Sequence, residues 1–527
     1  MVEEGATAAA RRDLIARRLG RLLFLGLIAA SLGYVAVNLG QELEGAEIGA
    51  TLPFLLLGVA LLIALGFEFV NGFHDTANAV ATVIYTTALP PTVAVVWSGL
   101  WNFLGVLASS GAVAYAVVAL LPVELILQVG SASGFAMVFA LLTAAILWNL
   151  GTWRLGLPNS SSHTLIGSII GVGVANQLLR GPEGTSGVDW SQAADVGRSL
   201  LFSPLIGFVL AGLLLLLAKR LIRVPALYRA PADRSPPPFW IRGLLILTST
   251  GVSFAHGSND GQKGMGLIML VLIGTVPTAF ALNRATTAEE AGALVAAAER
   301  AALALEAGSE QPAPDNPRPV VLDYLAQHAP TSTLPPALAA LLRDIAGQLR
   351  GYGSLDQVPG VERGNVRNDM FLAGEAARRL LAEDGAPLAD DTRAALLELT
   401  GHLDRATRFI PTWVKVAVAL ALGLGTMVGW RRIVVTVGEK IGRQHLTYGQ
   451  GATAELVAAG TIGGADLLGL PVSTTHVLSS GVAGTMAANG SGLQWATVRN
   501  LAIAWILTLP AAMLLSGGLY WLFLQAI

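Results

Sequence analysis

The sequence contains no cysteine, and charged residues make up only 13% of its 527 positions. The absence of cysteine excludes disulfides, zinc–thiolate sites, iron–sulfur clusters and cysteine nucleophiles. An average soluble domain has about 25% charged residues. A chain of 527 residues that is 53% hydrophobic cannot bury its apolar surface in one water-soluble core. The composition, with 60 glycines, therefore predicts closely packed helices in a lipid bilayer, and the net charge of −2 gives no reason to expect a nucleic-acid partner.

Long apolar runs divide the chain into membrane passages. A spanning helix needs about 20 apolar residues, and eleven runs qualify. The runs at 52–88 and 240–281 are too long for a straight crossing and contain polar residues and glycine in their middle, which predicts broken helices. The eleven runs lie near 19–39, 52–88, 92–121, 134–153, 160–178, 199–218, 240–281, 412–431, 447–468, 473–489 and 496–524.

Basic residues orient the passages, because lysine and arginine concentrate on the cytoplasmic side of a membrane. Basic clusters lie at 11–21, at 219–234 and at 431–443. If the passages alternate in direction, all three clusters face the cytoplasm, and the C-terminus lies outside. The basic start followed by an apolar run also fits a signal peptide. The run is long and has no clear small-residue cleavage site, which favours a retained helix.

Charge is concentrated in one late segment. Residues 282–411 hold 12 lysines and arginines and 18 aspartates and glutamates, a net charge of −6. On the topology above this segment faces outside. Its stretches 286–307 and 372–384 are rich in alanine, leucine, arginine and glutamate, which predicts amphipathic helices. It contains no chemical motif, so a solvated cap or an assembly domain is the simplest interpretation.

Four short motifs recur at matching intervals. Asn71-Gly-Phe-His-Asp75 corresponds to His256-Gly-Ser-Asn-Asp260, and a Gly-Leu-Pro motif that ends at His163 corresponds to one that ends at His476. Asp75 and His163 are 88 positions apart, whereas Asp260 and His476 are 216 apart. The difference of 128 nearly equals the 130 residues of segment 282–411. Removing that segment brings the two halves into register, with five passages in each.

These observations predict an all-α polytopic membrane protein built from two inverted repeats of about five transmembrane passages with broken helices, plus one extra N-terminal helix. An odd number of passages inverts the second repeat, and such repeats usually place the substrate site near the middle of the membrane. The expected divisions are a basic N-terminus and extra helix at 1–51, repeat 1 at 52–218, a basic cytoplasmic linker at 219–239, repeat 2 at 240–281 and 412–527, and a hydrophilic helical insert at 282–411.

Two hydroxyl triplets predict an anion site. Each follows a Leu-Pro pair and precedes an apolar helical run, as expected at the start of a helix. A helix that begins inside the membrane offers free backbone N–H groups, hydroxyl donors and the positive end of its dipole, and two such ends can enclose a tetrahedral oxyanion. Simple helix capping is the alternative, and the duplication of the motif disfavours it. The triplets are Ser160, Ser161 and Ser162, and Ser473, Thr474 and Thr475.

Asp75 and Asp260 are acidic residues inside apolar passages. A charge at the bilayer centre costs about 2.5–3.5 kcal/mol, so such residues form pairs, bind cations or carry protons. Beside an anion site they repel the anion unless a proton or cation enters with it, which predicts coupled transport. A structural pair, for example Asp75 with Lys263, is the alternative. Asn78, Asn259 and Lys263 lie close to the aspartates in the sequence and are further candidate ligands.

Two glutamates and two histidines are candidates for moving the coupling ion. Glu68 lies two turns before Asp75, and Glu455 lies in the ninth passage, where it relays protons or extends to the membrane surface. His74 and His256 belong to the aspartate motifs, although a histidine in a membrane is often only a helix contact.

At these residues the sequence resembles the inorganic phosphate transporter (PiT) family, and within it the bacterial low-affinity Pit branch. The similarity extends over roughly 52–527, and its most specific segments are 71–82, 156–167, 256–264 and 470–480. The resemblance implies a homodimer in the inner membrane that imports phosphate as a secondary active symporter, in this branch as a neutral metal–phosphate complex moved with protons. It also implies that phosphate-site roles fall on Asp75, Asn78 and Asp260 and on the two hydroxyl triplets.

Several alternatives remain open. Sodium-coupled members of the family often carry glutamate where this chain has Asn102 and lack a lysine like Lys263, so the resemblance favours protons over sodium. A sodium-coupled phosphate symporter and a sulfate permease are the alternatives. The sequence has no His-Glu-x-x-His, Gly-x-Ser-x-Gly or Walker motif, so we expect neither an enzyme nor a resident cofactor. The expected cargo is phosphate with protons or sodium and a divalent metal such as Mg²⁺, whose ligands the sequence does not identify.

Overall fold

The structure is a computed structural model that describes residues 2–43, 51–181, 188–231, 235–309, 311–327, 331–382 and 388–526. Over these residues the protein is built from helices, and its β structure is limited to one bridge between Gly442 and Leu493. The predicted all-α class is therefore confirmed.

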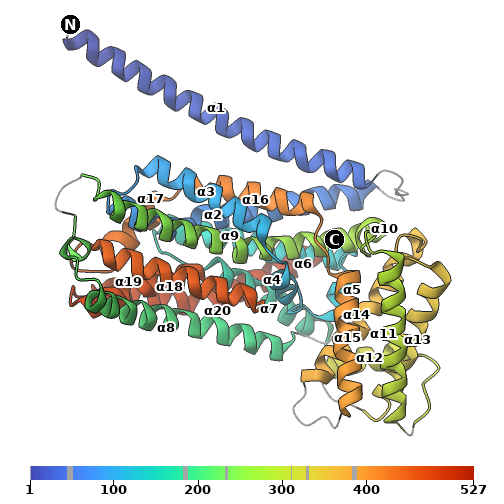
Figure 1. Cartoon of the computed structure of the whole chain (residues 1–527). Helices are drawn as coiled ribbons and strands as arrows, with labels where there is room; N and C mark the ends of the chain where they lie inside the picture. Colours follow the sequence, from blue (N-terminus) through green and yellow to red (C-terminus); the bar gives the residue numbers. More distant parts are fainter. Residues whose placement is uncertain are drawn as a thin grey trace.

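The membrane part is a bundle of long helices (Figure 1). Its first part contains α1 (Val2–Glu42), α2 (Thr51–Tyr85), α3 (Pro91–Ala108), α4 (Ala112–Val118), α5 (Val123–Leu127), α6 (Ala132–Arg154), α7 (Ser161–Arg180), α8 (Trp190–Leu221) and the short η1 (Pro225–Tyr228). Its second part contains α9 (Phe239–Thr275), α10 (Pro277–Phe280), α16 (Thr412–Thr426), α17 (Arg431–Val435), η2 (Thr436–Lys440), α18 (Tyr448–Leu467), α19 (Thr474–Asn489) and α20 (Trp495–Ala526).

Each of the eleven expected passages contains one long helix of the bundle. Among the described residues, six helices are long and apolar enough to cross a membrane, and the pair α15–α16, bent by 74°, makes a seventh if it is one span. The six are α1, α2, α3, α6, α8 and α20. The other passages contain polar or glycine-rich sequence, as at Ser258–Lys263 of α9, and much of their surface is buried inside the protein.

The two longest passages are not broken. α2 and α9 are continuous helices of 35 and 37 residues, so the prediction of breaks inside 52–88 and 240–281 is wrong. Their glycines serve close packing instead. A Cβ atom at Gly72 would lie 2.2 Å from the carbonyl oxygen of Leu422, and one at Gly257 would lie 2.1 Å from that of Asn102. Small residues let helix backbones approach closely in membranes, and here they do so without ending either helix.

Helices at corresponding positions of the two halves pack in corresponding pairs. α8 packs along α19, and the corresponding pair in the bundle is α20 with α7. Likewise, α3 packs along α9, and the corresponding pair is α16 with α2. α8 and α20 are both 32 residues long, and each contains one internal proline, Pro204 or Pro510. Every one of these pairs joins a helix of one half to a helix of the other.

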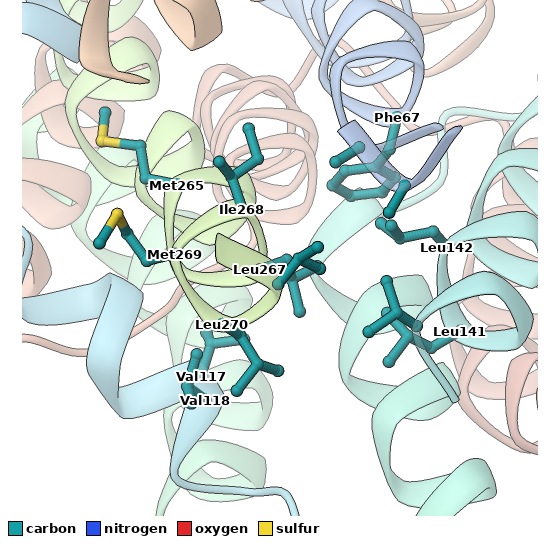
Figure 2. Packing of buried hydrophobic residues seen from close by; sticks show 14 of the residues in the cluster. Phe67, Val117, Val118, Leu141, Leu142, Met265, Leu267, Ile268, Met269 and Leu270 are labelled. Carbon is teal, nitrogen blue, oxygen red and sulfur yellow. The ribbon is translucent and has the colours of Figure 1, made fainter. Parts of the chain in front are cut away.

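The second half of α9 is surrounded by apolar side chains from several helices. Figure 2 shows Leu267 and Leu270 among residues that include Phe67 of α2, Val117 of α4 and Leu141 of α6. All five side chains are at most 3% exposed. In lipid the gain from such contacts comes from dense packing rather than from leaving water, and this packing fixes the position of α9.

The hydrophilic segment contains its own group of helices. They are α11 (Ala288–Ala307), α12 (Pro317–Gln327), α13 (Leu334–Tyr352), α14 (Gly360–Ala382) and α15 (Asp390–Thr407). α11 begins at a capping box in which Thr287 and Glu290 satisfy each other's backbone N–H groups. The five helices enclose a hydrophobic cluster separate from the cluster around α9. Figure 1 shows them at the end of the bundle opposite α17.

α1 lies apart from the rest of the bundle in Figure 1. Its packing partner is α16, its Phe24 ring lies 6.4 Å from that of Phe69, and its Glu42 pairs with Arg284 at 3.1 Å. Large apolar side chains such as Leu22 and Val37 are 67% and 59% exposed. A helix that is apolar on every side suits direct contact with lipid.

Candidate functional site

Two helices begin in the interior of the protein, each at a hydroxyl triplet. Ser160 caps α7 by accepting a hydrogen bond from the backbone N–H of His163 at 3.1 Å. Ser473 caps α19 in the same way, with the N–H of His476 at 3.1 Å. Each cap follows a non-helical segment that contains proline, and both are buried. The structure therefore confirms the helix starts that the two hydroxyl triplets predicted.

Asp75 of α2 connects the starts of both helices. Its Oδ1 accepts a hydrogen bond from Thr475 at 2.8 Å and lies 3.0 Å from Nδ1 of His74, while its Oδ2 accepts one from Ser161. The Asp75 side chain is 2% exposed. A buried carboxylate is costly unless it is hydrogen-bonded or paired, and here hydroxyls from α7 and α19 supply the bonds.

Asp260 of α9 lies on the other side of Ser161. Its Oδ1 is 2.7 Å from Nζ of Lys263, which also donates to Ser162 at 2.5 Å. Its Oδ2 accepts a hydrogen bond from Ser161 at 3.5 Å, so one hydroxyl bridges the two carboxylates. Lys263 pairs with Asp260, not with Asp75 as in the structural alternative, because residues three apart share one face of a helix.

Three other predicted ligands, Asn259, Thr474 and Asn78, have different surroundings. Asn259 donates to the carbonyl of Leu470 at 3.1 Å and accepts from the N–H of Val472 at 3.4 Å, so it fixes the segment ahead of α19. Thr474 lies at the start of α19 with a buried hydroxyl that has no hydrogen-bond partner among the described residues. Asn78 is in α2, and its side chain lies outside the part of the chain that the structure describes.

Two histidines connect the carboxylates to neighbouring helices. The Nε2 of His256 lies 3.5 Å from Asp260, and its Nδ1 lies 2.8 Å from Oδ1 of Asn102. The Nε2 of His74 lies 3.2 Å from the hydroxyl of Thr152. The sequence analysis did not predict a role for Thr152, and it considered Asn102 only through the family resemblance. Their polarity inside apolar passages was the available signal.

The predicted glutamates lie on either side of the aspartates. Glu68 is seven residues before Asp75 in α2, which is about 10 Å along a helix axis. One of its oxygens is 3.3 Å from Asn71, and the other has no hydrogen-bond partner among the described residues. Glu455 accepts hydrogen bonds from Thr248 at 2.5 Å and from Thr82, which is seven residues after Asp75. Glu455 is fully buried, so the alternative that it extends to the membrane surface is wrong.

The aspartates and His256 also form a group that can hold a cation. Asp75, His256 and Asp260 each offer one ligand atom, and these atoms lie within 4.8 Å of one another. Carboxylate oxygens and an imidazole nitrogen suit a divalent cation. The ammonium of Lys263 already lies beside Asp260, so a metal ion at that oxygen would displace it. Two carboxylates and one ammonium leave the unprotonated site with a net negative charge, which disfavours an anion.

Comparison with known proteins identifies one family by sequence. A family model described as "Phosphate transporter family" matches residues 71–516. The chain is 45% identical over 494 residues to a protein of Escherichia coli (strain K12) named "Low-affinity inorganic phosphate transporter PitA", covering 89% of this chain and 97% of that protein. It is 27% identical over 470 residues to a "Probable low-affinity inorganic phosphate transporter" of Bacillus subtilis (strain 168), with coverage of 89% and 97%. A solved structure titled "The sodium-dependent phosphate transporter" has a TM-score of 0.48 at 18% identity, covering 90% of this chain and 99% of that one.

Proposed function

Because the chain belongs to the phosphate transporter family, we propose that it imports inorganic phosphate as a secondary active symporter driven by protons. Its relatives are named as transporters and not as enzymes, in agreement with the absence of catalytic motifs. The observation that carries the proposal is the meeting of two hydroxyl-bearing helix starts at the pair Asp75 and Asp260.

Phosphate binding rests on donors that converge from three helices. The hydroxyls of Ser161 and Thr475 and the ammonium of Lys263 currently donate to carboxylate or hydroxyl oxygens within the site. Thr474 adds a buried hydroxyl with no partner in the described part of the chain. A phosphate that enters with protons takes these donors from the carboxylates, while the N-terminal dipoles of α7 and α19 favour its charge. Ser160 and Ser473 keep their role as caps.

Proton coupling follows from the charge of the site. Without added protons the carboxylates of Asp75 and Asp260 outnumber the ammonium of Lys263, and a divalent phosphate is repelled. Protonation of a carboxylate removes that repulsion and frees hydroxyl donors at the same time. Glu68 and Glu455, on opposite sides of Asp75, are proposed to pass protons toward and away from this pair, with His74 and His256 as neighbours that accept them.

Two contacts favour protons over sodium. Oδ1 of Asn102 accepts a hydrogen bond from Nδ1 of His256 at 2.8 Å, and the neutral amide supplies no negative charge. Lys263 lies 2.7 Å from Asp260, where a sodium ion would otherwise bind. If phosphate travels as a neutral complex with Mg²⁺, Asp75, His256 and Asp260 are the proposed metal ligands, because their ligand atoms lie within 4.8 Å of one another.

We further propose that the corresponding helix pairs reflect two inverted repeats and that the site is exposed alternately to each side of the membrane. In this arrangement the linker side is cytoplasmic, and the insert and C-terminus lie outside the inner membrane. A homodimer is proposed from the family resemblance, and the molar mass of the detergent-solubilised protein tests it.

The deciding experiment is uptake of labelled phosphate into proteoliposomes with an imposed pH gradient, with and without sodium and magnesium. The proposal predicts uptake that follows the pH gradient without sodium and that sulfate does not inhibit, since sulfate cannot carry the coupled proton near neutral pH. Uptake that requires sodium contradicts proton coupling, and equal inhibition by sulfate indicates a general oxyanion carrier.

A further inference from the structure

A basic cavity opens at the linker end of the bundle, away from the aspartate site. It has a volume of about 670 Å³ and lies between the end of α6 and the segment from Gly429 through α17. Its charged lining residues are Arg154, Arg431, Arg432 and Lys440. None of its lining residues is acidic. The described residues place no carboxylate within ion-pair distance of these four cations.

A second cavity at the insert end is built from the corresponding positions. It has a volume of about 630 Å³ and includes Gly111 and Gly469, whereas the basic cavity includes Gly429 and Gly156. Gly111 and Gly429 each come three residues after a helix, α3 or α16, and Gly156 and Gly469 each precede a Leu-Pro pair. All four have positive φ, between 67° and 92°. Each cavity thus takes one such glycine from each half of the chain, and the two correspond to each other.

The two cavities differ in charge. At the insert end each arginine is paired: Arg379 with Asp189, and both Arg378 and Arg408 with Glu375. At the linker end Arg432 is held in place by donating to the carbonyl of Arg154 at 2.7 Å and by stacking 5.0 Å from the ring of Trp153. Arg154, Arg431 and Lys440 have exposed side chains that face no acid in the cavity lining.

We propose that the basic cavity is a second anion site, which binds a phosphate-type oxyanion either as free inorganic phosphate or as the head group of an anionic lipid. Four cations around a concave space focus a positive potential, and arginine's planar group suits bidentate contact with phosphate oxygens. An excess of basic residues on one side of a membrane protein is common, but that excess alone does not gather them around one cavity.

The position of the cavity relates it to the transport path. Gly156, in its lining, is four residues before Ser160, the cap of α7. The hydroxyl of Thr436, also in the lining, donates to the carbonyl of Gly156 at 2.8 Å. An anion in the cavity therefore sits beside the segment that leads to the aspartate site, on the linker side. The proposal does not depend on which ion drives transport.

Equilibrium binding of radiolabelled phosphate to the full-length protein in lipid-free neutral detergent tests the proposal. We expect two binding processes in the wild type. The double variant S161A/T475A removes two of the hydroxyl donors at the aspartate site and should weaken that process while leaving the second. The triple variant R154Q/R431Q/K440Q, which keeps the structural contacts of Arg432, should weaken the second process at least tenfold. R220Q/R223Q is the matched control, because it removes exposed cations at the same end of the bundle that do not line the cavity.

A lipid arm separates the two sources of the oxyanion. Native mass spectrometry after addition of phosphatidylglycerol, with phosphatidylcholine for comparison, reports whether a head group binds. A phosphatidylglycerol adduct that the triple variant loses and the control retains supports the site and identifies a lipid as its occupant. Loss of the second phosphate process alone identifies free phosphate. If the triple variant matches the wild type in both arms, the proposal is overturned.

The single variants R431Q and K440Q, each expected to show a smaller loss, decide the matter if the triple variant does not fold. Loss of coupled uptake with intact binding at both sites counts against the proposed function instead.

Discussion

The insert and the membrane bundle use charge in opposite ways. In the insert, several ion pairs lie at the surface, as between Arg300 and Glu398, whose side chains are 52% and 46% exposed. In the bundle, Asp75, Asp260 and Lys263 are at most 3% exposed. An exposed ion pair changes the free energy of folding only a little. Burying an ion pair often costs more desolvation free energy than the attraction between the charges returns. The buried charges therefore reduce the stability of the bundle, and we infer that they are kept for transport.

The largest expected effect is on transport itself. Asp260→Asn should reduce proton-driven phosphate uptake to the background of empty liposomes, because a neutral amide cannot accept the coupled proton. Uptake by reconstituted protein with an imposed pH gradient measures this effect, and Asp75→Asn should behave in the same way. Glu398→Gln, which removes an exposed carboxylate of the insert, is the control and should transport normally. If both aspartate variants retain proton-dependent uptake, the inference that the buried charges of the bundle are kept for transport is wrong.

The next effect is on the stability of the bundle. Lys263→Met leaves Asp260 without its ammonium partner and should destabilise the fold by about 3 kcal/mol, as for other broken buried pairs. The double variant Asp260→Asn/Lys263→Met should recover most of this loss, because no charge then remains unpaired, but it should not recover uptake. Thermal unfolding in detergent compares the stability of the wild type, the single variant and the double variant. Equal destabilisation of the single and double variants would show that the ammonium acts through packing alone.

Close helix contact gives a somewhat smaller effect. Gly257→Ala places a methyl group against the carbonyl of Asn102 and should cost about 2 kcal/mol as the helices separate. Gly243→Ala in the same helix has no heavy atom within 4 Å of the added group and should be neutral or slightly stabilising. The two melting temperatures give the comparison directly, and similar values for both variants would argue against tight contact between α3 and α9.

The insert should respond to acid. Burial opposes the ionisation of Glu375, but Arg378 and Arg408 outweigh it and hold its pKa below the usual value of 4.5. A lowered pKa in the folded state contributes stability above pH 4.5 that is lost as the pH falls through the folded value. Hydrogen exchange in α14, corrected for its intrinsic pH dependence, should therefore be faster at pH 4 than at pH 6. Glu375→Gln should remove this difference, and a wild-type profile without any pH effect would contradict it.

The smallest effect is expected at the surface of the insert. Arg350→Gln breaks an exposed pair with Glu299 and should change the free energy of unfolding by less than about 0.5 kcal/mol. Addition of 0.5 M salt should leave even less difference between variant and wild type. A larger loss in thermal stability would show that surface pairs of the insert do more than keep it solvated.

Much of the site could be predicted from repetition in the sequence. Asp75 and Asp260 recur in corresponding motifs, as do the hydroxyl triplets, and the structure brings them together. Thr152 was missed, and Asn102 was considered only through the family resemblance, because the corresponding positions hold Ala465 and Leu422, so no repeat marked them. The continuity of α2 and α9 was missed for a different reason. A glycine in an apolar passage can end a helix or admit a neighbouring backbone, and only the three-dimensional contact distinguishes the two.

The close glycine contacts also determine how the molecule can be divided. Gly425 of α16 meets the backbone of α2 at Phe69, and Gly105 of α3 meets the backbone of α9 at Phe254. Each contact joins a helix that precedes the 219–239 linker to a helix that follows it. Each part of the chain supplies only some of the side chains that form the site, so neither part functions by itself. A gene split within the linker should consequently encode two fragments that are inactive when produced separately and that assemble into a working protein when produced together.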